Sequence, residues 1–315
     1  MALCLATVFA VNAADALSGK FTININGDQV VFSKGNLQAT TTDFGTNWTW
    51  IFAEHQWSFV GDAAANTSIS ENGTVSVNDT VDLFGWSTAI TYYGINKSKT
   101  NNDYFGDFVE WGNNISEDWY TLNKEEWAYL FFGRTDAAHL FGMGSVNGVN
   151  GAILLPDNWA GAKFTDTDNG LTDKGASFYN NNGTNYSFHT FTAEQWSAMQ
   201  ANGAVFLPAT GYRGGTDLYN VEGGYYWSSS PDDVYHAQYA YYVYFNPYLL
   251  NPQTSDLRSN GHSVRLVKAA PSGEKDIDQI NDQMNKCGNE KLLHNGQIYS
   301  LRGDKSYTLQ GQEME

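Results

Sequence analysis

The sequence predicts an α+β fold, with two short helices supporting a small, loop-rich mixed sheet and a short β-rich C-terminal tail. Short aromatic or β-branched runs alternate with Gly, Asn and Asp clusters, a pattern typical of strands joined by turns. Only two segments combine an N-terminal cap with apolar residues at helical spacing. The 315 residues allow one large or two modest domains with a sizeable core.

The N-terminus predicts export. An apolar run, 1–12, ends in small residues, which is typical of the h-region and cleavage site of a secretory signal whose basic n-region is missing. We expect residues 1–13 to be removed and the protein to be secreted or displayed at a cell surface. A short buried strand is the alternative, whereas the run is too short to span a bilayer.

The first half of the domain is expected to be mostly strands and loops. Residues 21–32 predict a β-hairpin around Asn26-Gly27, a favoured two-residue turn. Residues 48–60 predict a second strand and turn whose aromatic side chains enter a core, and 61–80 predict a polar surface insertion. Two aromatic segments, 81–86 and 108–112, are expected to be buried anchors in loops.

Two helices follow. Residues 123–132 start with Asn123 as the cap and acidic residues in the first turn, and 192–199 start with Thr192 as the cap and Gln195 completing a capping box. Each helix is followed by a short apolar strand that ends at a proline, 152–156 and 204–208. These strands and helices are placed in one domain, 18–268.

The end of the chain has a different character. Residues 269–290 predict a linker and a short polar helix, 276–286. Residues 291–315 predict a β tail with two β segments, which we interpret as a sorting or attachment segment.

Charge and cysteine usage exclude several classes. The net charge of −17 disfavours nucleic acid and anionic membrane surfaces, because both would repel the protein. The two cysteines, Cys4 and Cys287, cannot build a disulfide framework or a zinc cluster. The six histidines show no metal spacing, and neither a nucleophile elbow nor a phosphate-binding glycine loop is present. We therefore expect no catalytic residues, no enzyme activity and no metal ligands. Loop acids leave structural calcium open as the one cofactor.

The segment 224–268 carries the functional prediction. It starts with Tyr225-Tyr226-Trp227, continues through many tyrosines, and ends with an alternating run, 263–267, that predicts a strand. Tyrosine offers a large amphipathic contact area at low entropic cost, and Ser, Gly and Asn add adaptable hydrogen bonds. Within 242–245 we expect Val243 and Phe245 to face inward and the tyrosines outward. Exposed apolar residues in the flanking loops favour a partner.

The expected function is recognition of a protein or glycan ligand at a cell surface, without nucleic acid and without a membrane-spanning segment. Asp256 and Arg258 are expected to orient a polar group, and the aromatic side chains to supply stacking area. The alternative is a structural or adhesive surface component that packs against a neighbouring subunit through the same residues. The predicted ligand-binding residues are Trp227, Asp232, Asp233, Tyr235, His236, Tyr239, Tyr241, Tyr244, Asn246, Tyr248, Asp256, Arg258, Ser259 and His262.

Three motifs resemble a known family. Residues 121–130 (TLNKEEWAYL), 226–230 (YWSSS) and 261–267 (GHSVRLV) resemble segments of the formylglycine-generating-enzyme-like group and, more closely, the Fibrobacter-type major paralogous domain of secreted Bacteroidales proteins. The resemblance covers about 18–268 and implies a C-type lectin fold. The reactive cysteine pair of the enzymes is missing, so their oxidase activity is not expected, and a hydrolase on this fold is a minor alternative. The calcium-dependent sugar signatures of animal lectins are missing too.

The same fold is used by surface proteins that are diversified by retroelements. Adenine mutagenesis of Asn codons yields codons that cannot encode Gln, Glu, Lys, Met or Trp, and within 232–262 only Gln238 and Gln253 would have to be fixed. The resemblance therefore gives the hypothesis of a diversified ligand-binding segment there.

Overall fold

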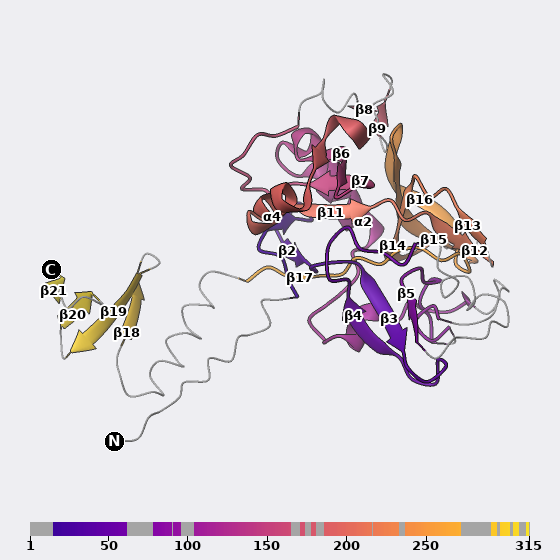
Figure 1. Ribbon diagram of the computed structural model, residues 1–315, viewed down its shortest axis with the longest axis horizontal. Coiled ribbons are helices and arrows are strands. Elements are labelled where there is room, and N and C mark those ends of the chain that lie inside the picture. The colour runs from indigo at the N-terminus through magenta and orange to yellow at the C-terminus, as the bar shows by residue number, and fades with distance from the viewer. Residues whose placement is uncertain are drawn as a thin grey trace. The chain divides into compact units, whose positions relative to one another are not determined.

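The structure is a computed structural model that describes residues 15–61, 78–89, 91–95, 104–164, 186–215, 217–232 and 237–271, together with the backbone of short strands within 171–180 and after 291. The chain divides into two units, Met1–Ala269 and Ala270–Glu315. The first unit combines two helices with several small sheets and belongs to the α+β class (Figure 1). The predicted signal peptide, most of the insertion 61–80 and the helix 276–286 lie outside the described residues.

The first sheet brings the two ends of the domain to one strand, because the first and last strands both pair with the middle strand of the sheet. Its strand order is β1 (Phe21–Thr22), β2 (Gln29–Phe32) and β17 (Val267–Ala269), with both pairs antiparallel. Both ends of the domain contact β2 at Phe32. The N–H of Leu17 donates to the Phe32 carbonyl at 2.8 Å, and Val267 is the ladder partner of Phe32.

The predicted hairpin is present, but its ladder is shorter than the pattern suggests. Gly27 adopts a φ of +84°, which is accessible to glycine and lets the chain turn. Asn24 ends the β1 strand early, since its side-chain oxygen accepts from the backbone N–H groups of Asn26 and Asp28. Ile25, expected within the strand, is therefore 88% exposed.

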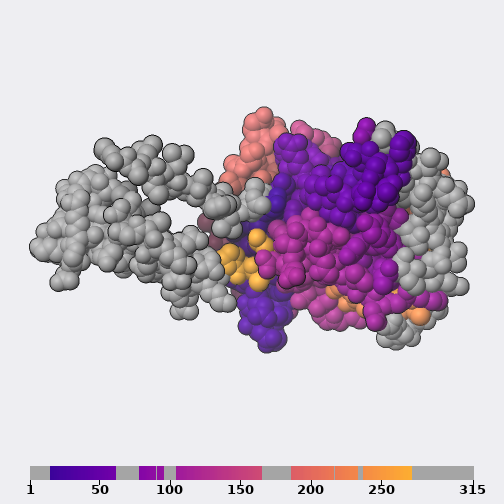
Figure 2. Space-filling model, turned by 90° about the horizontal axis from the view of Figure 1, so that it is seen from below, coloured from indigo at the N-terminus to yellow at the C-terminus, as the bar shows by residue number. Residues whose placement is uncertain are grey.

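Two further sheets form the middle of the domain. The order of one is β4 (Thr49–Phe52), β3 (Leu37–Thr41) and β5 (Asp79–Val81), and the order of the other is β10 (Thr190–Phe191), β6 (Phe141–Val146), β7 (Val149–Leu154) and β11 (Val205–Pro208). Phe52 of β4 contacts Trp119 at a ring separation of 4.9 Å. Figure 2 shows the indigo-to-purple N-terminal segment lying against the magenta segment that carries Trp119.

Both predicted helices are present with capping boxes at their N-termini. Helix α2 (Lys124–Ala128) is capped by Asn123 with Glu126 and continues as a π-helical turn, Tyr129–Gly133. Helix α4 (Ala193–Ala201) is capped by Thr192 with Gln195. Each box satisfies backbone N–H groups that a helix start leaves without partners. Short 3-10 turns occur at Trp111–Asn114, Ala137–His139 and Tyr186–Phe188.

The largest sheet is built from the C-terminal part of the domain (orange in Figure 1). Its strand order is β14 (Gly224–Pro231), β15 (Tyr239–Asn246), β16 (Leu249–Leu257), β9 (Phe178–Asn180) and β8 (Leu171–Asp173). A separate hairpin, β12 (Tyr212–Gly214) with β13 (Asp217–Tyr219), contacts it through a Tyr212–Tyr225 ring pair at 4.9 Å.

The predicted aromatic anchors are buried, since Phe84, Trp86 and Trp111 are each 0% exposed. The predicted strand 263–267 is not regular. Ser263 makes an isolated parallel bridge to Tyr226, and the regular strand starts only at Val267. All residues of this segment are buried, so its alternating sequence does not correspond to one solvent-exposed face and one buried face.

Arg265, in the same segment, joins four parts of the fold. Its guanidinium is fully buried and donates to the Asn36 side-chain oxygen and the Phe206 carbonyl, both at 3.3 Å, and to Gln56 Oε1 at 2.9 Å. Burial lowers its pKa to about 10, so it stays charged at neutral pH. Arg265 thereby connects residues 263–267 to the loop after β2, to the loop after β4 and to β11.

The second unit contains one antiparallel sheet in which consecutive strands are neighbours. Four strands are present where the sequence predicted two β segments: β18 (Lys291–His294), β19 (Gln297–Arg302), β20 (Lys305–Thr308) and β21 (Glu313–Met314). Over the described parts of the chain, no helix is long and apolar enough to cross a bilayer.

Candidate functional site

The predicted binding segment forms the three-stranded part of the large sheet, β14–β15–β16. Residues opposite each other on neighbouring strands share a face. Tyr225 lies opposite Tyr244, and Trp227 lies opposite Tyr242. These side chains therefore belong to one face of the sheet, whereas Val243 and Phe245 belong to the other face and enter the main core.

Strand β15 alternates as predicted, but the face that carries its tyrosines is also covered. Tyr242 points away from Val243 and Phe245, yet it is only 9% exposed and belongs to a second hydrophobic cluster around Trp227, so the outward position predicted for it is not open to solvent. Val243 and Phe245 are fully buried as predicted. The register shift between Tyr242 and Tyr244 lies in the pairing of β15 with β16, whereas the pairing with β14 is regular from Tyr242 to Phe245.

Trp227 lies at the centre of that second cluster and has no exposed surface. Its indole N–H donates to the Phe84 carbonyl at 2.7 Å, and its ring stacks on His262 with centroids 4.0 Å apart. The structure therefore places this predicted contact residue beneath the surface, where it supports the sheet.

His262 and Asp256 form a pair beside the tyrosines, in which the histidine is fully buried and the carboxylate is half-buried. His262 Nε2 lies 3.1 Å from Asp256 Oδ2, and the imidazole is fully buried. Burial lowers the pKa of His262 despite the neighbouring carboxylate, and the charge of Arg213 lowers it further. Burial would raise the pKa of Asp256, but hydrogen bonds from His262, Asn260 and the Leu257 N–H outweigh it and lower that pKa. At neutral pH we therefore infer a neutral His262 that donates from Nε2 to an ionised Asp256.

This pair predicts a pH dependence of stability. The pKa of His262 in the folded protein is lower than its ordinary value of 6.5, which applies to the unfolded chain. As pH falls below 6.5, the unfolded chain therefore binds a proton that the folded protein does not bind, and the folded state loses stability relative to the unfolded state. We expect the free energy of unfolding to fall by up to about 1.4 kcal/mol per pH unit below pH 6.5. The His262→Gln variant keeps a donor for Asp256 and should lose most of this slope, as urea titrations between pH 7 and pH 5 would show. Equal slopes in the two proteins would contradict the assignment.

Tyrosines from four strands meet on the same face. We call this the tyrosine face and define it as Tyr212, Tyr219, Tyr225, Tyr242 and Tyr244. Neighbouring ring centroids are 4.9 to 5.6 Å apart, from the Tyr219–Tyr212 stack through Tyr225 to Tyr242 and Tyr244. The side-chain amides of Asn220 and Asn246 donate to the hydroxyls of Tyr225 and Tyr244. This network holds the rings in fixed positions.

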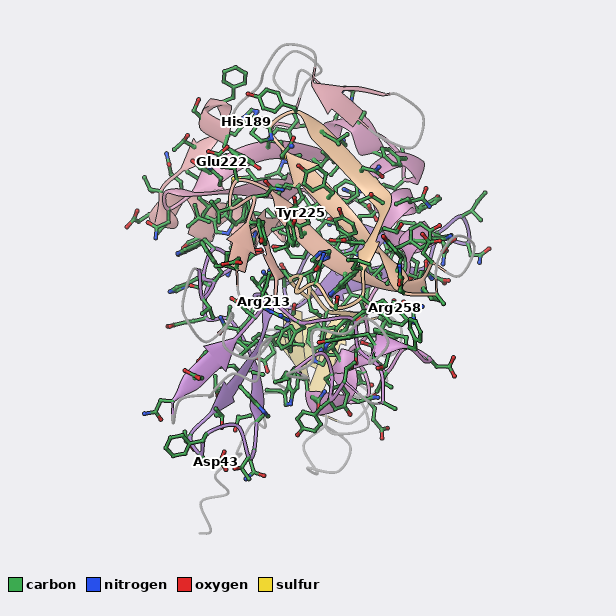
Figure 3. All side chains as sticks on the ribbon, turned by 90° about the vertical axis from the view of Figure 1, so that its right-hand side faces the viewer. Asp43, His189, Arg213, Glu222, Tyr225 and Arg258 are labelled. Atoms are coloured by element: carbon green, nitrogen blue, oxygen red, sulfur yellow. The ribbon has the colours of Figure 1, made fainter. Side chains whose placement is uncertain are left out.

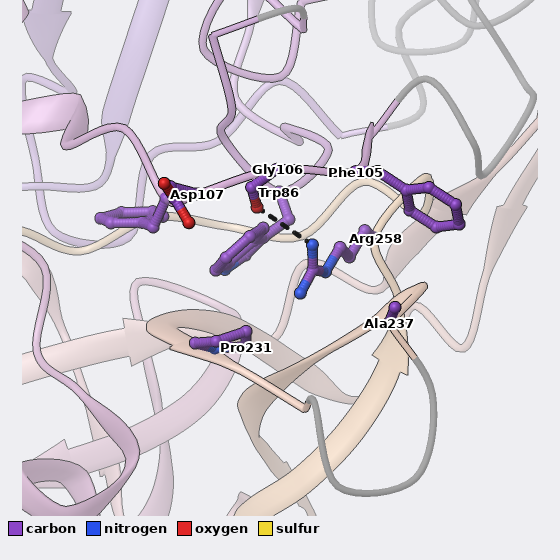
Figure 4. Close-up of a pocket in the computed structure, with 8 residues that line it drawn as sticks. Trp86, Phe105, Gly106, Asp107, Pro231, Ala237 and Arg258 are labelled. Carbon is purple, nitrogen blue, oxygen red and sulfur yellow. Dashed lines mark hydrogen bonds between the residues drawn. The ribbon is translucent and has the colours of Figure 1, made fainter.

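A hollow of about 490 Å³ lies at the far end of β15 and β16 from their connecting turn (Figure 4). Arg258 is at its base, with the guanidinium 4.2 Å from the ring centroid of Trp86. Arg258 Nε donates to the Tyr239 carbonyl at 3.0 Å, and Nη1 donates to the Gly106 carbonyl at 3.2 Å. The hollow is lined by Trp86, Phe105, Gly106, Asp107, Phe108, Pro231, Ala237 and Arg258.

The chemistry of the hollow suits binding. It combines apolar and aromatic walls with one guanidinium and one carboxylate, and its volume lies within the roughly 300–1,000 Å³ of ligand pockets. Phe105 is 39% exposed at its edge, and Asp107 is exposed as well. Among the described residues that line it, none is a histidine, a cysteine or a hydroxyl nucleophile. Within the described part of the chain, no group of three or more potential metal ligands occurs.

The predicted site residues do not form one surface. Figure 3 looks onto this side of the domain, with Tyr225, Arg213 and Arg258 labelled on three different segments. Asp256 and His262 lie with the tyrosine face, and Arg258 lies at the hollow. Tyr239 and Tyr241 belong to the opposite face of β15, where Lys124 Nζ sits 4.0 Å from the Tyr241 ring centroid.

The other predicted residues are dispersed. Asn246 and Tyr248 lie in the β15–β16 turn, where Asn246 Oδ1 accepts from the Tyr248 N–H and Tyr248 is 59% exposed. Asp232 is 3% exposed, and Ser259 is half-buried. Asp233, Tyr235 and His236 lie outside the described residues.

Most residues of these two sites are absent from the predicted set. Tyr212 and Tyr219, with Tyr225 and Tyr242, belong to the tyrosine face, and Arg258 is the one predicted residue among the described residues that line the hollow. Tyr212 and Tyr219 flank the turn at Gly214-Gly215, and this hairpin pattern could have identified both tyrosines. No local pattern brings residues 86 and 105 next to residue 258.

Comparison with known proteins adds no relative to this description: neither a protein-family model nor a curated protein nor a solved structure matches the chain.

Proposed function

We propose that this protein is an exported, non-catalytic binding protein that recognises a glycan or protein partner through the C-terminal part of its domain. The observation that carries the proposal is the hollow around Arg258. The guanidinium is held in place by backbone carbonyls and by the face of Trp86. A fixed cation in an aromatic recess can orient a polar group of a ligand while the walls contact its apolar part.

Other features agree with recognition. The net charge of −17 favours solubility at high protein concentration and disfavours anionic polymers as partners. The rings on the neighbouring tyrosine face are fixed by hydrogen bonds, so little side-chain entropy would be lost on contact. The lectin-like family, the surface location and the diversification of 232–262 remain predictions from the sequence.

The test is a glycan and protein array probed with the exported chain and with variants at the edge of the hollow. We expect Phe105→Ala and Asp107→Asn to weaken any captured ligand by about tenfold, since each removes an exposed contact from a pocket edge. Both side chains are exposed, so stability should change little. Phe44→Ala is the matched control, because Phe44 is 64% exposed and does not line the hollow.

Two outcomes would argue against the proposal. One is an array on which no glycan or protein is captured. The other is a ligand whose affinity is the same for the unmodified protein, for Phe105→Ala and for Asp107→Asn.

A further inference from the structure

The tyrosine face is bordered by carboxylates. Asp217 lies two residues before Tyr219 on β13, so both side chains belong to the same face of that strand. Glu222 is exposed in the following turn, where its carbonyl accepts from the Tyr186 hydroxyl at 2.6 Å. Asp256 is close enough to raise the pKa of Tyr212, second to burial of that phenol. Asp217 and Glu222 are thus close to Tyr219 in the chain, and Asp256 is close to Tyr212 in space.

Among the residues that the structure describes on β12–β16, no exposed cation balances the charge of these acids. Arg213 and Arg258 are the arginines of these elements, and they are 1% and 3% exposed. Arg258 points to the hollow, and the carbonyl and N–H of Arg213 both bond to Gly261. His262 is buried with a lowered pKa. The exposed surface of the tyrosine face is thus acidic as well as aromatic.

Apolar side chains extend this surface. Tyr219 is 44% exposed, and one side of its ring stacks on Tyr212 at 5.3 Å. Val221 and Tyr248, in the turns at this end of the sheet, are 61% and 59% exposed. Contiguous exposed apolar groups next to charges are typical of protein-binding surfaces.

We propose that the tyrosine face docks a basic segment of a protein partner, with arginine or lysine side chains lying over Tyr219 and paired with Asp217 and Glu222. A cation over a tyrosine ring and beside a carboxylate gains from both groups at once. The chain itself places a cation over a tyrosine ring at Lys124–Tyr241 and over a tryptophan ring at Arg258–Trp86.

Charge complementarity favours this occupant over a neutral glycan. A neutral partner that covered Asp217, Glu222 and Asp256 would remove three carboxylates from water without supplying an opposite charge. A basic segment supplies that charge. This docking surface is separate from the hollow, so the inference does not depend on the function proposed for the hollow.

The test uses an (Arg-Ser)₄ peptide as the probe, titrated against the full chain at 0.05 M and 0.15 M salt. We expect saturable binding that weakens with salt, because the contacts are exposed ion pairs. The double variant Asp217→Asn/Glu222→Gln should lose about fivefold to tenfold in affinity. Glu117→Gln/Asp118→Asn is the charge-matched control, since both of its residues are exposed on another segment, and it should lose less than about twofold.

Further variants separate the rings from the charges. Tyr219→Leu should weaken the peptide by about threefold or more, while Tyr92→Leu, at a tyrosine that is 52% exposed elsewhere, should not. An (Glu-Ser)₄ peptide should not bind, and Phe105→Ala should leave (Arg-Ser)₄ binding unchanged. Absence of binding to the unmodified chain, or equal losses in the two double variants, would overturn the proposal. Equal losses would mean that overall acidity alone attracts the peptide.

Discussion

Replacing Trp227 by alanine is expected to lower the free energy of unfolding by about 3–5 kcal/mol, the cost typical of removing a buried tryptophan. The indole has no exposed surface, donates to the Phe84 carbonyl and stacks on His262. Truncation would leave a cavity and remove one of the two donors to the Phe84 carbonyl, which also accepts from the His262 N–H at 2.9 Å. Urea unfolding followed by circular dichroism measures the loss.

Trp159→Ala provides the matched control, because the Trp159 side chain is half-buried and bonds only to the nearby Ala162 carbonyl. A clearly smaller loss is expected for it. If Trp227→Ala instead unfolded at nearly the same urea concentration as the unmodified chain but lost a ligand, Trp227 would be a surface contact, as the sequence alone suggested.

Arg265→Ala should have an effect of similar size, lowering the free energy of unfolding by more than about 3 kcal/mol. The guanidinium donates to Asn36, Gln56 and Phe206, which come from three distant segments. Its removal would take one donor from each of these buried acceptors and leave a cavity between the segments. Gln56 Oε1 would keep its second donor, the Phe206 N–H at 2.7 Å.

Arg265→Lys keeps the charge and tests the geometry of the contact. A lysine ammonium cannot reproduce the planar fork that reaches three acceptors, so only part of the lost stability should return. Thermal unfolding of the two variants and of the unmodified chain gives the comparison. Complete recovery with lysine would show that the charge alone matters at this position.

Local features of the fold were predictable because their causes are local. Both helices begin where a cap and its capping-box partner stand three residues apart, at Asn123 and Thr192. The hairpin also forms over the expected residues, but its turn spans 24–27 rather than the two residues predicted, because the Ile23 N–H donates to the Asp28 carbonyl. Ile25 departed from its pattern because the Asn24 side chain competes with the backbone ladder.

The candidate site was predictable only as a region of the chain. Aromatic composition indicated 224–268 and alternation predicted the direction of the tyrosines in 242–245, but neither could reveal that a second hydrophobic cluster covers Tyr242. Burial of Trp227 and His262 depends on contacts with residue 84 and with residues of the same sheet. The hollow depends on Trp86 and Phe105, which approach Arg258 only in the folded chain.

The position of β2 between the first and last strands has a mechanical consequence. Leu17 and Val267 both contact β2 at Phe32, so the chain enters and leaves the domain beside the same strand, each time at roughly the 5 Å spacing of neighbouring strands. Tension applied between the segment before residue 17 and the segment after residue 269 would be borne first by these short ladders. The sheet on which the proposed binding surfaces lie is joined to the last strand through the bonds of Ser263 with Tyr225 and Trp227, so it would be loaded only after the ladders on β2 had opened.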